Sequence, residues 1–129
     1  MKTIRLVICT LSTLMCLGCR TQTQLVLCED VTRATDMPWI ASLVKTGSSS
    51  LGQKLEKIDR ITYSQEGSNS TNTGFYVIYE YKCCDIPNEY IYNCDGDMIS
   101  IYGGIAGCEG ECRLKILTRT NIYKAFGVK

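Results

Sequence analysis

The stretch Gly74–Asp85 reads GFYVIYEYKCCD, and its composition points to the fold class. Its first half contains aromatic and β-branched residues, which favour pleated, half-buried strands. Residues 74–82 are therefore predicted to form a strand. Because successive side chains of a strand point to opposite faces, we expect Tyr79 to face the core and Tyr76 to face solvent.

Further short strand patterns surround this stretch. They are residues 24–30 (QLVLCED), 58–64 (IDRITYS), 97–104 (DMISIYGG) and 112–120 (CRLKILTRT). Residues 37–44 contain Pro38 followed by apolar residues and predict a short helical turn, whereas 46–53 and 65–74 are polar and predict loops. Residues 86–93 (IPNEYIYN) carry turn residues and two tyrosines. Several short strands without a long amphipathic helix are typical of an all-β sandwich.

Residues 1–18 have the pattern of a secretory signal peptide. Two basic residues precede an apolar run, residues 6–17, that is too short to span a bilayer. Cleavage before Cys19 would leave a single secreted β domain, residues 19–129. The sequence Leu17-Gly18-Cys19 at the cleavage site also fits a lipid-anchored bacterial surface protein. In that alternative, Cys19 would carry the lipid.

The chain is close to neutral, with 14 Lys and Arg, 13 Asp and Glu and a formal net charge of +1. No overall field therefore directs it towards nucleic acid or a membrane surface. Bases gather in a basic C-terminal tail, residues 118–129, and an anionic partner such as a glycosaminoglycan or nucleic acid is one interpretation. We prefer the other interpretation, a solvated strand with a frayed end.

The sequence contains no catalytic constellation. It has no His, which excludes Ser-His-Asp and Cys-His nucleophile systems and Cys₂His₂ zinc sites. Glu29 and Asp30 are adjacent, but neighbouring strand residues point to opposite faces and do not share a proton. Asp95 and Asp97 are interpreted as a polar turn, because calcium needs about six to eight oxygen ligands. We therefore expect a non-enzymatic protein without a metal or cofactor.

The chain contains nine cysteines. Two lie in the predicted signal peptide, and the domain body contains Cys28, Cys83, Cys84, Cys94, Cys108 and Cys112. Export implies an oxidising compartment, so we expect these six to form three disulfides rather than a thiolate metal site. The sequence does not choose among the pairings. Cys19 is the odd residue and is a candidate for an interchain disulfide in a homodimer.

Residues 69–71 (Asn-Ser-Thr) form an N-glycosylation sequon in the polar loop 65–74. In an exported eukaryotic chain we expect Asn69 to carry a glycan. The same loop is the candidate for a protease-binding loop if the protein is an inhibitor. A glycan on Asn69 would make it a poor inhibitory loop, so occupancy of this residue separates the two interpretations.

Two short patterns recur in the same order in both halves of the chain. Residues 26–29 (VLCE) resemble 77–80 (VIYE), and residues 59–62 (DRIT) resemble 97–100 (DMIS). Residues 74–80 also fit the pattern G-x-[YW]-V-x-Y-E. A repeated strand domain with this pattern resembles the βγ-crystallin superfamily. The resemblance implies a βγ-crystallin-like Greek key β-sandwich, here stapled by disulfides.

The match to the crystallin pattern ends at Glu80. In that family an aromatic-x-Gly forms the sharp first hairpin, whereas here Tyr81-Lys82-Cys83-Cys84 follows. We interpret the cysteine pair as a structural substitute for that glycine. The calcium motif of the family is also incomplete in residues 96–101.

The overall plan is similar to that of crystallin-like egg glycoproteins secreted by parasitic blood flukes. The shared features are a signal peptide, a small size, many cysteines and crystallin-like halves. This resemblance implies an extracellular immunomodulator that binds host immunoglobulin or chemokines. The alternatives are a secreted toxin or an inhibitor of a protease or channel, and the lipid-anchored protein described above.

Overall fold

The computed structural model describes residues 27–82 and 85–127 of the chain. Its elements are the 3₁₀ turns η2 (Cys28–Asp30) and η3 (Ala34–Asp36), helix α2 (Pro38–Thr46), and strands β1 (Leu55–Gln65), β2 (Asn72–Tyr79), β3 (Pro87–Asn93), β4 (Met98–Gly103), β5 (Cys108–Gly110) and β6 (Leu114–Lys124). Residues in strands greatly outnumber residues in helices and 3₁₀ turns, so the expectation of a mostly β protein is confirmed.

The six strands form one antiparallel sheet with the order β5-β4-β3-β2-β1-β6. Strands β1 to β5 follow one another as a meander, and β6 returns to pair with β1. A crystallin-like Greek key sandwich is not confirmed, because the described strands belong to one sheet rather than to two packed sheets.

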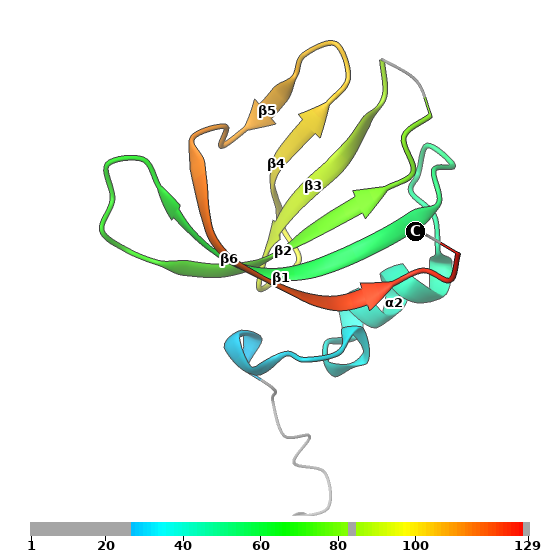
Figure 1. The fold of residues 1–129 in the computed structure, drawn as a ribbon, viewed down its shortest axis with the longest axis horizontal. Helices are drawn as coiled ribbons and strands as arrows, with labels where there is room; N and C mark the ends of the chain where they lie inside the picture. Colours follow the sequence, from blue (N-terminus) through cyan, green and yellow to red (C-terminus); the bar gives the residue numbers. More distant parts are fainter. Residues whose placement is uncertain (1–26, 83–84, 128–129) are drawn as a thin grey trace, which may run out of the picture.

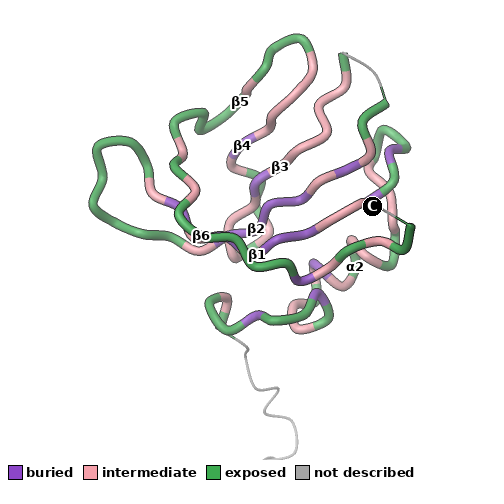
Figure 2. Tube along the Cα trace, in the orientation of Figure 1, coloured by how far each residue is buried: buried purple, intermediate pink, exposed green. Residues whose placement is uncertain are grey.

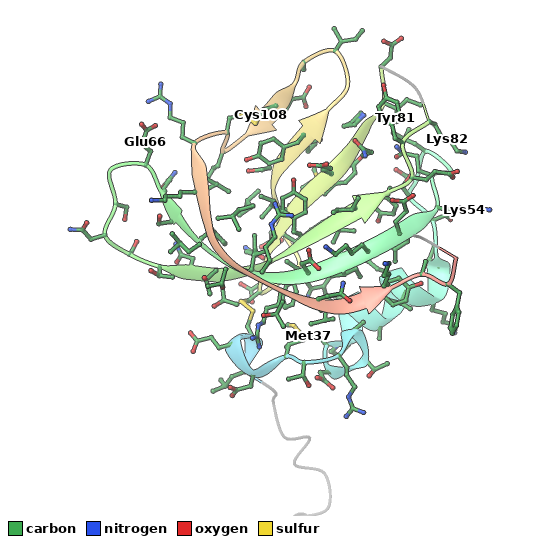
Figure 3. All side chains as sticks on the ribbon, in the orientation of Figure 1. Met37, Lys54, Glu66, Tyr81, Lys82 and Cys108 are labelled. Carbon is green, nitrogen blue, oxygen red and sulfur yellow. A yellow bond between two sulfur atoms is a disulfide. The ribbon has the colours of Figure 1, made fainter. Side chains whose placement is uncertain are left out.

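The sheet is strongly curved. Strands β5 and β6 lie at opposite ends of the strand order, yet residues 111–113 suffice to connect them. Tyr102 of β4 and Ile116 of β6 pack in one cluster around Tyr76 and Ile91, although three strands separate β4 from β6. This face is therefore the inner side of the curve, which side chains fill (Figures 1 and 3).

Helix α2 and the two 3₁₀ turns lie on the outer side of the curved sheet (Figure 1). Ile40 of α2 packs with Ile58, Phe75 and Val77 in the outer core cluster. Trp39 meets the edge of Phe75, with ring centroids 5.4 Å apart. The purple segments of Figure 2 show that burial concentrates on the central strands β1 and β2.

Two local expectations are wrong. Cys28–Asp30 forms a 3₁₀ turn rather than part of a strand, so VLCE and VIYE do not form equivalent elements; Val26 lies outside the described residues. Residues 87–93, which read as turn residues, form the full strand β3. Pro87 is its first residue, a position where a missing backbone N–H is tolerated.

The predicted orientation of the tyrosines is half correct. Tyr79 is buried in the outer core beside Phe75 and Val77, as expected. Tyr76 points to the other face as predicted, but it is only 6% exposed. The curvature of the sheet closes that face over its own side chains, so both faces of β2 are covered.

The described residues contain two disulfides, Cys28–Cys94 and Cys108–Cys112. The first joins η2 to the turn after β3 across 66 positions of sequence, and the second closes a loop across 4 positions. Four of the six predicted residues are thus disulfide-bonded. Cys83, Cys84 and Cys19 lie outside the described residues.

The loop closed by Cys108 and Cys112 requires glycine at one position. Gly110 has φ +87°, and a Cβ there would lie 2.4 Å from the carbonyl oxygen of Ile99. We expect Gly110→Ala to lower the free energy of unfolding by at least about 2 kcal/mol. Gly107→Ala is the matched control, because Gly107 has φ +71° but open space around it.

Urea unfolding of the two variants measures this difference. Gly107→Ala is expected to cost about 1 kcal/mol, because only the left-handed backbone is strained. Equal losses in the two variants would show that the close approach to Ile99 has no energetic consequence.

Candidate functional site

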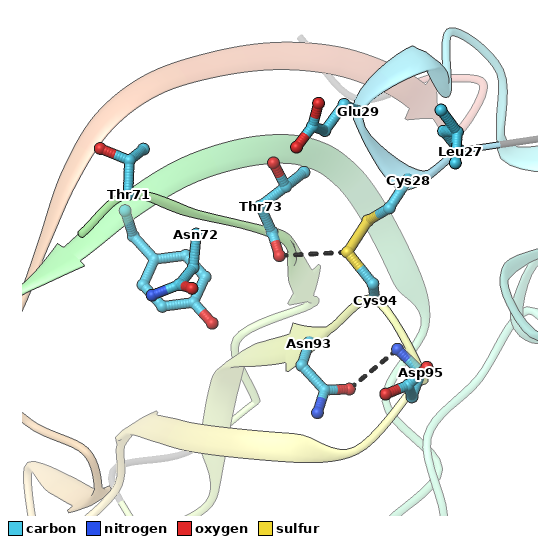
Figure 4. A pocket seen from close by; sticks show the side chains of 10 residues that line it. Leu27, Cys28, Glu29, Thr71, Asn72, Thr73, Asn93, Cys94 and Asp95 are labelled. Atoms are coloured by element: carbon cyan, nitrogen blue, oxygen red, sulfur yellow. Dashed lines mark hydrogen bonds between the residues drawn. A yellow bond between two sulfur atoms is a disulfide. The ribbon is translucent and has the colours of Figure 1, made fainter.

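The described structure contains a groove with polar and apolar lining beside the Cys28–Cys94 disulfide, at the start of β2. We call it the η2 groove. It consists of two adjoining hollows of about 460 and 290 Å³ that share Glu29, Thr71 and Thr73. The larger hollow is lined by Leu27, Cys28, Glu29, Tyr63, Thr71, Asn72, Thr73, Asn93, Cys94 and Asp95 (Figure 4). The smaller is lined by Glu29, Arg60, Thr62, Thr71 and Thr73.

The disulfide positions one wall of the groove against the other. Cys28 brings η2 and Glu29 alongside the start of β2, and Cys94 Sγ lies 3.2 Å from the carbonyl oxygen of Thr73. A disulfide sulfur carries no hydrogen, so this is a packing contact. Figure 4 shows the side chains of Glu29 and Thr73 on the same side of the disulfide.

Arg60 anchors the other end of η2. Its Nη1 donates to the carbonyl oxygens of Glu29 and Val31, the latter at 2.8 Å. The side chain is half-buried, and Arg60 forms no ion pair with a described carboxylate. One nitrogen of the guanidinium is therefore occupied by the backbone, while Nη2 and Nε keep their donor capacity.

Some of the other polar side chains that line the groove are hydrogen-bonded within the protein, and others are not. Asn93 is committed to the turn after β3, since its Oδ1 accepts the backbone N–H of Asp95 and Asp97 at 3.0 and 2.9 Å. Within the part of the chain that the structure describes, the side chains of Asn72 and Thr73 make no hydrogen bond. The groove therefore offers free hydroxyl and amide groups to a ligand.

Tyr63 lines the larger hollow but packs in the inner cluster with Tyr76 and Ile91. It is buried, and burial, followed by the nearby charge of Glu111, raises the pKa of its hydroxyl above the usual value of 10.0. At physiological pH the hydroxyl is protonated, so it can hydrogen-bond but cannot act as a base.

A second polar cluster lies on the inner face. Asp59 is only 1% exposed, with Lys57 Nζ 2.8 Å from its Oδ2 and Asn121 Nδ2 3.0 Å from its Oδ1. Nearby, the Tyr76 hydroxyl donates to Glu89, and the Arg119 guanidinium lies 4.3 Å from the centre of the Tyr76 ring. Each of these groups therefore has a partner within the sheet, although Asp59 Oδ2 has only the ion pair with Lys57.

The Tyr76 hydroxyl belongs to the interior of the protein. Burial, followed by the hydrogen bond to Glu89 and its charge, raises the pKa of Tyr76 to about 12. We assign the whole inner cluster a structural role, because its charged and hydroxyl groups already have partners within the sheet.

The basic residues of 118–129 lie mainly on a strand, which agrees with the preferred interpretation of a solvated strand. Arg119 and Lys124 belong to β6, which pairs along β1 as far as Lys57↔Lys124. Strand pairing therefore continues through most of the segment, because β6 supplies the outer neighbour of β1. The two final residues lie outside the description.

Other predicted residues are placed as follows. Asn69 lies in the exposed connection between β1 and β2. Asp95 and Asp97 form a polar turn around Asn93, as interpreted from the sequence. The described residues contain no cluster of three or more potential metal-ligating side chains. No helix in the described ranges is long and apolar enough to cross a membrane.

Sequence reasoning did not find the groove. Thr62, Thr71 and Thr73 read only as strand and loop residues, and Arg60 as a strand residue. Their meeting depends on the register Thr62↔Thr73 and on the disulfide that brings η2 over them. The alternation of Thr71 and Thr73 around Asn72 is the single local signal of a polar row.

Comparisons with protein-family models, curated proteins and solved structures found no match to this chain. The assignment of function therefore rests on the geometry of the η2 groove and on the sequence.

Proposed function

We propose that this chain is a secreted, non-enzymatic binding protein that engages an extracellular protein partner through the η2 groove. The observation that carries the proposal is a groove whose walls are joined by the Cys28–Cys94 disulfide and whose lining residues Asn72 and Thr73 make no side-chain hydrogen bond within the described residues. A prepositioned site loses less conformational entropy when a partner binds. Two disulfides among the described residues are also typical of proteins in oxidising compartments.

The class of partner comes from the crystallin resemblance rather than from the groove. That resemblance names immunoglobulin and chemokines as the first probes and makes the protein an immunomodulator, while the sequon at residues 69–71 makes it a glycoprotein with a glycan on Asn69. Because the sheet topology differs from a crystallin sandwich, a binding experiment has to test the partner directly.

Surface plasmon resonance against immobilised immunoglobulins and a chemokine panel tests this function. We expect Asn72→Arg to weaken binding about tenfold or more, because an arginine there fills the larger hollow. Ser42→Arg, at an exposed position of α2 that does not line the groove, is the control and is expected to bind like the wild type.

Two results would contradict this proposal. Absence of binding to every immunoglobulin and chemokine would remove the proposed partners. Equal binding by the wild type and Asn72→Arg would show that the partner binds outside the groove.

An inhibitor of a protease or channel is the second candidate. The connection between β1 and β2, residues 66–71, is exposed throughout, as an inhibitory loop must be. Asn69 lies within it, so glycosylation would shield the loop. Inhibition of a protease by Asn69→Gln but not by the glycosylated protein would favour this candidate over the groove.

A further inference from the structure

We propose that the smaller hollow of the η2 groove binds a carboxylate-bearing sugar, such as a terminal sialic acid on a glycoprotein. The carboxylate of the sugar would pair with Arg60, and its hydroxyls would meet the threonine row and Glu29. This inference rests on the proposed binding function of the groove and specifies which part of a partner enters it.

Arg60 is the residue that would bind the carboxylate. It is half-buried and held in place by two backbone carbonyls, and it has no described carboxylate as ion-pair partner. A guanidinium presents a planar fork of donors that matches a carboxylate, and a fixed fork loses little freedom on binding. The free donors therefore make the hollow a carboxylate site.

The surrounding side chains favour a sugar as the carrier of that carboxylate. Thr62, Thr71 and Thr73 place three hydroxyls around the hollow, and each can both donate and accept a hydrogen bond. The Thr62 hydroxyl also lies 2.6 Å from that of Thr118, so it is held in position. A ligand rich in hydroxyls can use such groups, whereas an apolar ligand would leave them unpaired.

Glu29 makes the hollow more selective for a sugar acid than for a simple anion such as phosphate. Its carboxylate lines both hollows and would repel a doubly charged phosphate more strongly than a singly charged carboxylate. The hydroxyls of a sugar can donate to Glu29 while its carboxylate meets Arg60. One hollow thus offers complementary groups for both ends of a sugar acid.

The size of the groove fits a short oligosaccharide. The smaller hollow, about 290 Å³, lies near the lower end of the range for small-molecule sites, about 300–1,000 Å³. It opens into the larger hollow, where Asn72 keeps an unoccupied amide for the next sugar residue. We therefore place the acidic sugar against Arg60 and the following residue beside Asn72.

The test uses 3′-sialyllactose and lactose as probes and saturation-transfer NMR with the disulfide-intact protein. We expect 3′-sialyllactose to bind and lactose to bind at least about tenfold more weakly, because lactose lacks the carboxylate. Equal binding of the two sugars, or no binding of either, would overturn the proposal.

Variants locate the site. Arg60→Gln is expected to weaken 3′-sialyllactose binding about 10- to 100-fold, which is the range for a lost charge-assisted hydrogen bond. Because Arg60 also anchors η2, Thr73→Val serves as a second variant that removes a hydroxyl while keeping the shape of the side chain. We expect it to weaken binding about threefold or more. Thr120→Val, on β6 and not lining the groove, is the matched control and should bind normally.

Treatment of a bound partner glycoprotein with sialidase separates this inference from the proposed function. Loss of binding after treatment supports both. Unchanged binding to the treated partner would overturn the sugar site and leave the protein-binding function standing. Binding of 3′-sialyllactose without binding to any immunoglobulin or chemokine would support the sugar site and overturn the proposed protein partners.

Discussion

Replacing Cys28 and Cys94 together by alanine is expected to cause the larger loss of stability of the two disulfide deletions. This bond spans 66 positions of sequence, whereas Cys108–Cys112 spans 4. In the chain-entropy model the longer loop contributes about 4 kcal/mol and the shorter about 2 kcal/mol, because a longer closed loop removes more freedom from the unfolded chain. The long disulfide also joins η2 to the sheet, so its loss should open the groove.

Urea unfolding followed by fluorescence measures both variants. Trp39, the single tryptophan, packs against Phe75 in the outer core and reports loss of that packing. The Cys108→Ala/Cys112→Ala variant is the matched control, since it also removes one disulfide. Equal losses of free energy in the two variants would contradict the loop-length argument.

Asp59→Ala is expected to destabilise the protein by about 3 kcal/mol. The substitution leaves Asn121 Nδ2 without the carboxylate and removes the ion-pair partner of Lys57. Lys57 is 37% exposed and can turn towards water, which keeps the cost towards the lower end for a buried pair. The effect arises because Oδ2 of Asp59 is buried and no described group other than Lys57 balances its charge.

An exposed ion pair provides the control for Asp59. Glu66 and Arg113 lie 3.7 Å apart with side chains 71% and 83% exposed, and Glu66→Gln should cost less than about 1 kcal/mol. The double variant Lys57→Met/Asp59→Leu should recover part of the loss, because it leaves no buried charge unpaired. A loss below about 1 kcal/mol for Asp59→Ala would show that the inner cluster contributes little.

Local sequence patterns predicted several elements correctly. The alternation around Val77 placed Tyr79 in the core, and Pro38 marked the start of α2. The same reasoning failed at Cys28–Asp30, where the disulfide and the carbonyl contacts of Arg60 stabilise a 3₁₀ turn. The predicted loop before β1 is present, but local patterns did not show that Gln53 within it is completely buried, with its amide donating to Pro87 O at 3.1 Å.

The burial of Gln53 and the η2 groove were both missed for the same reason. In both cases the decisive contacts join residues distant in sequence, such as Glu29 with Arg60 and Gln53 with Pro87. The pattern of apolar and polar residues within one segment does not predict such contacts. The cysteine count predicted disulfides without their pairing, because pairing depends on which segments the sheet brings together.

Local patterns and the number of cysteines were enough to predict a mostly β, disulfide-containing chain, because strand preference and cysteine content are local or compositional properties. The curvature of the sheet, the burial of Tyr76 and the groove beside Cys28–Cys94 were decided by tertiary structure. Each depends on the register of strands and on the return of β6 to β1. These features depend on contacts between residues distant in sequence, and such contacts form and contribute to stability only when the chain folds.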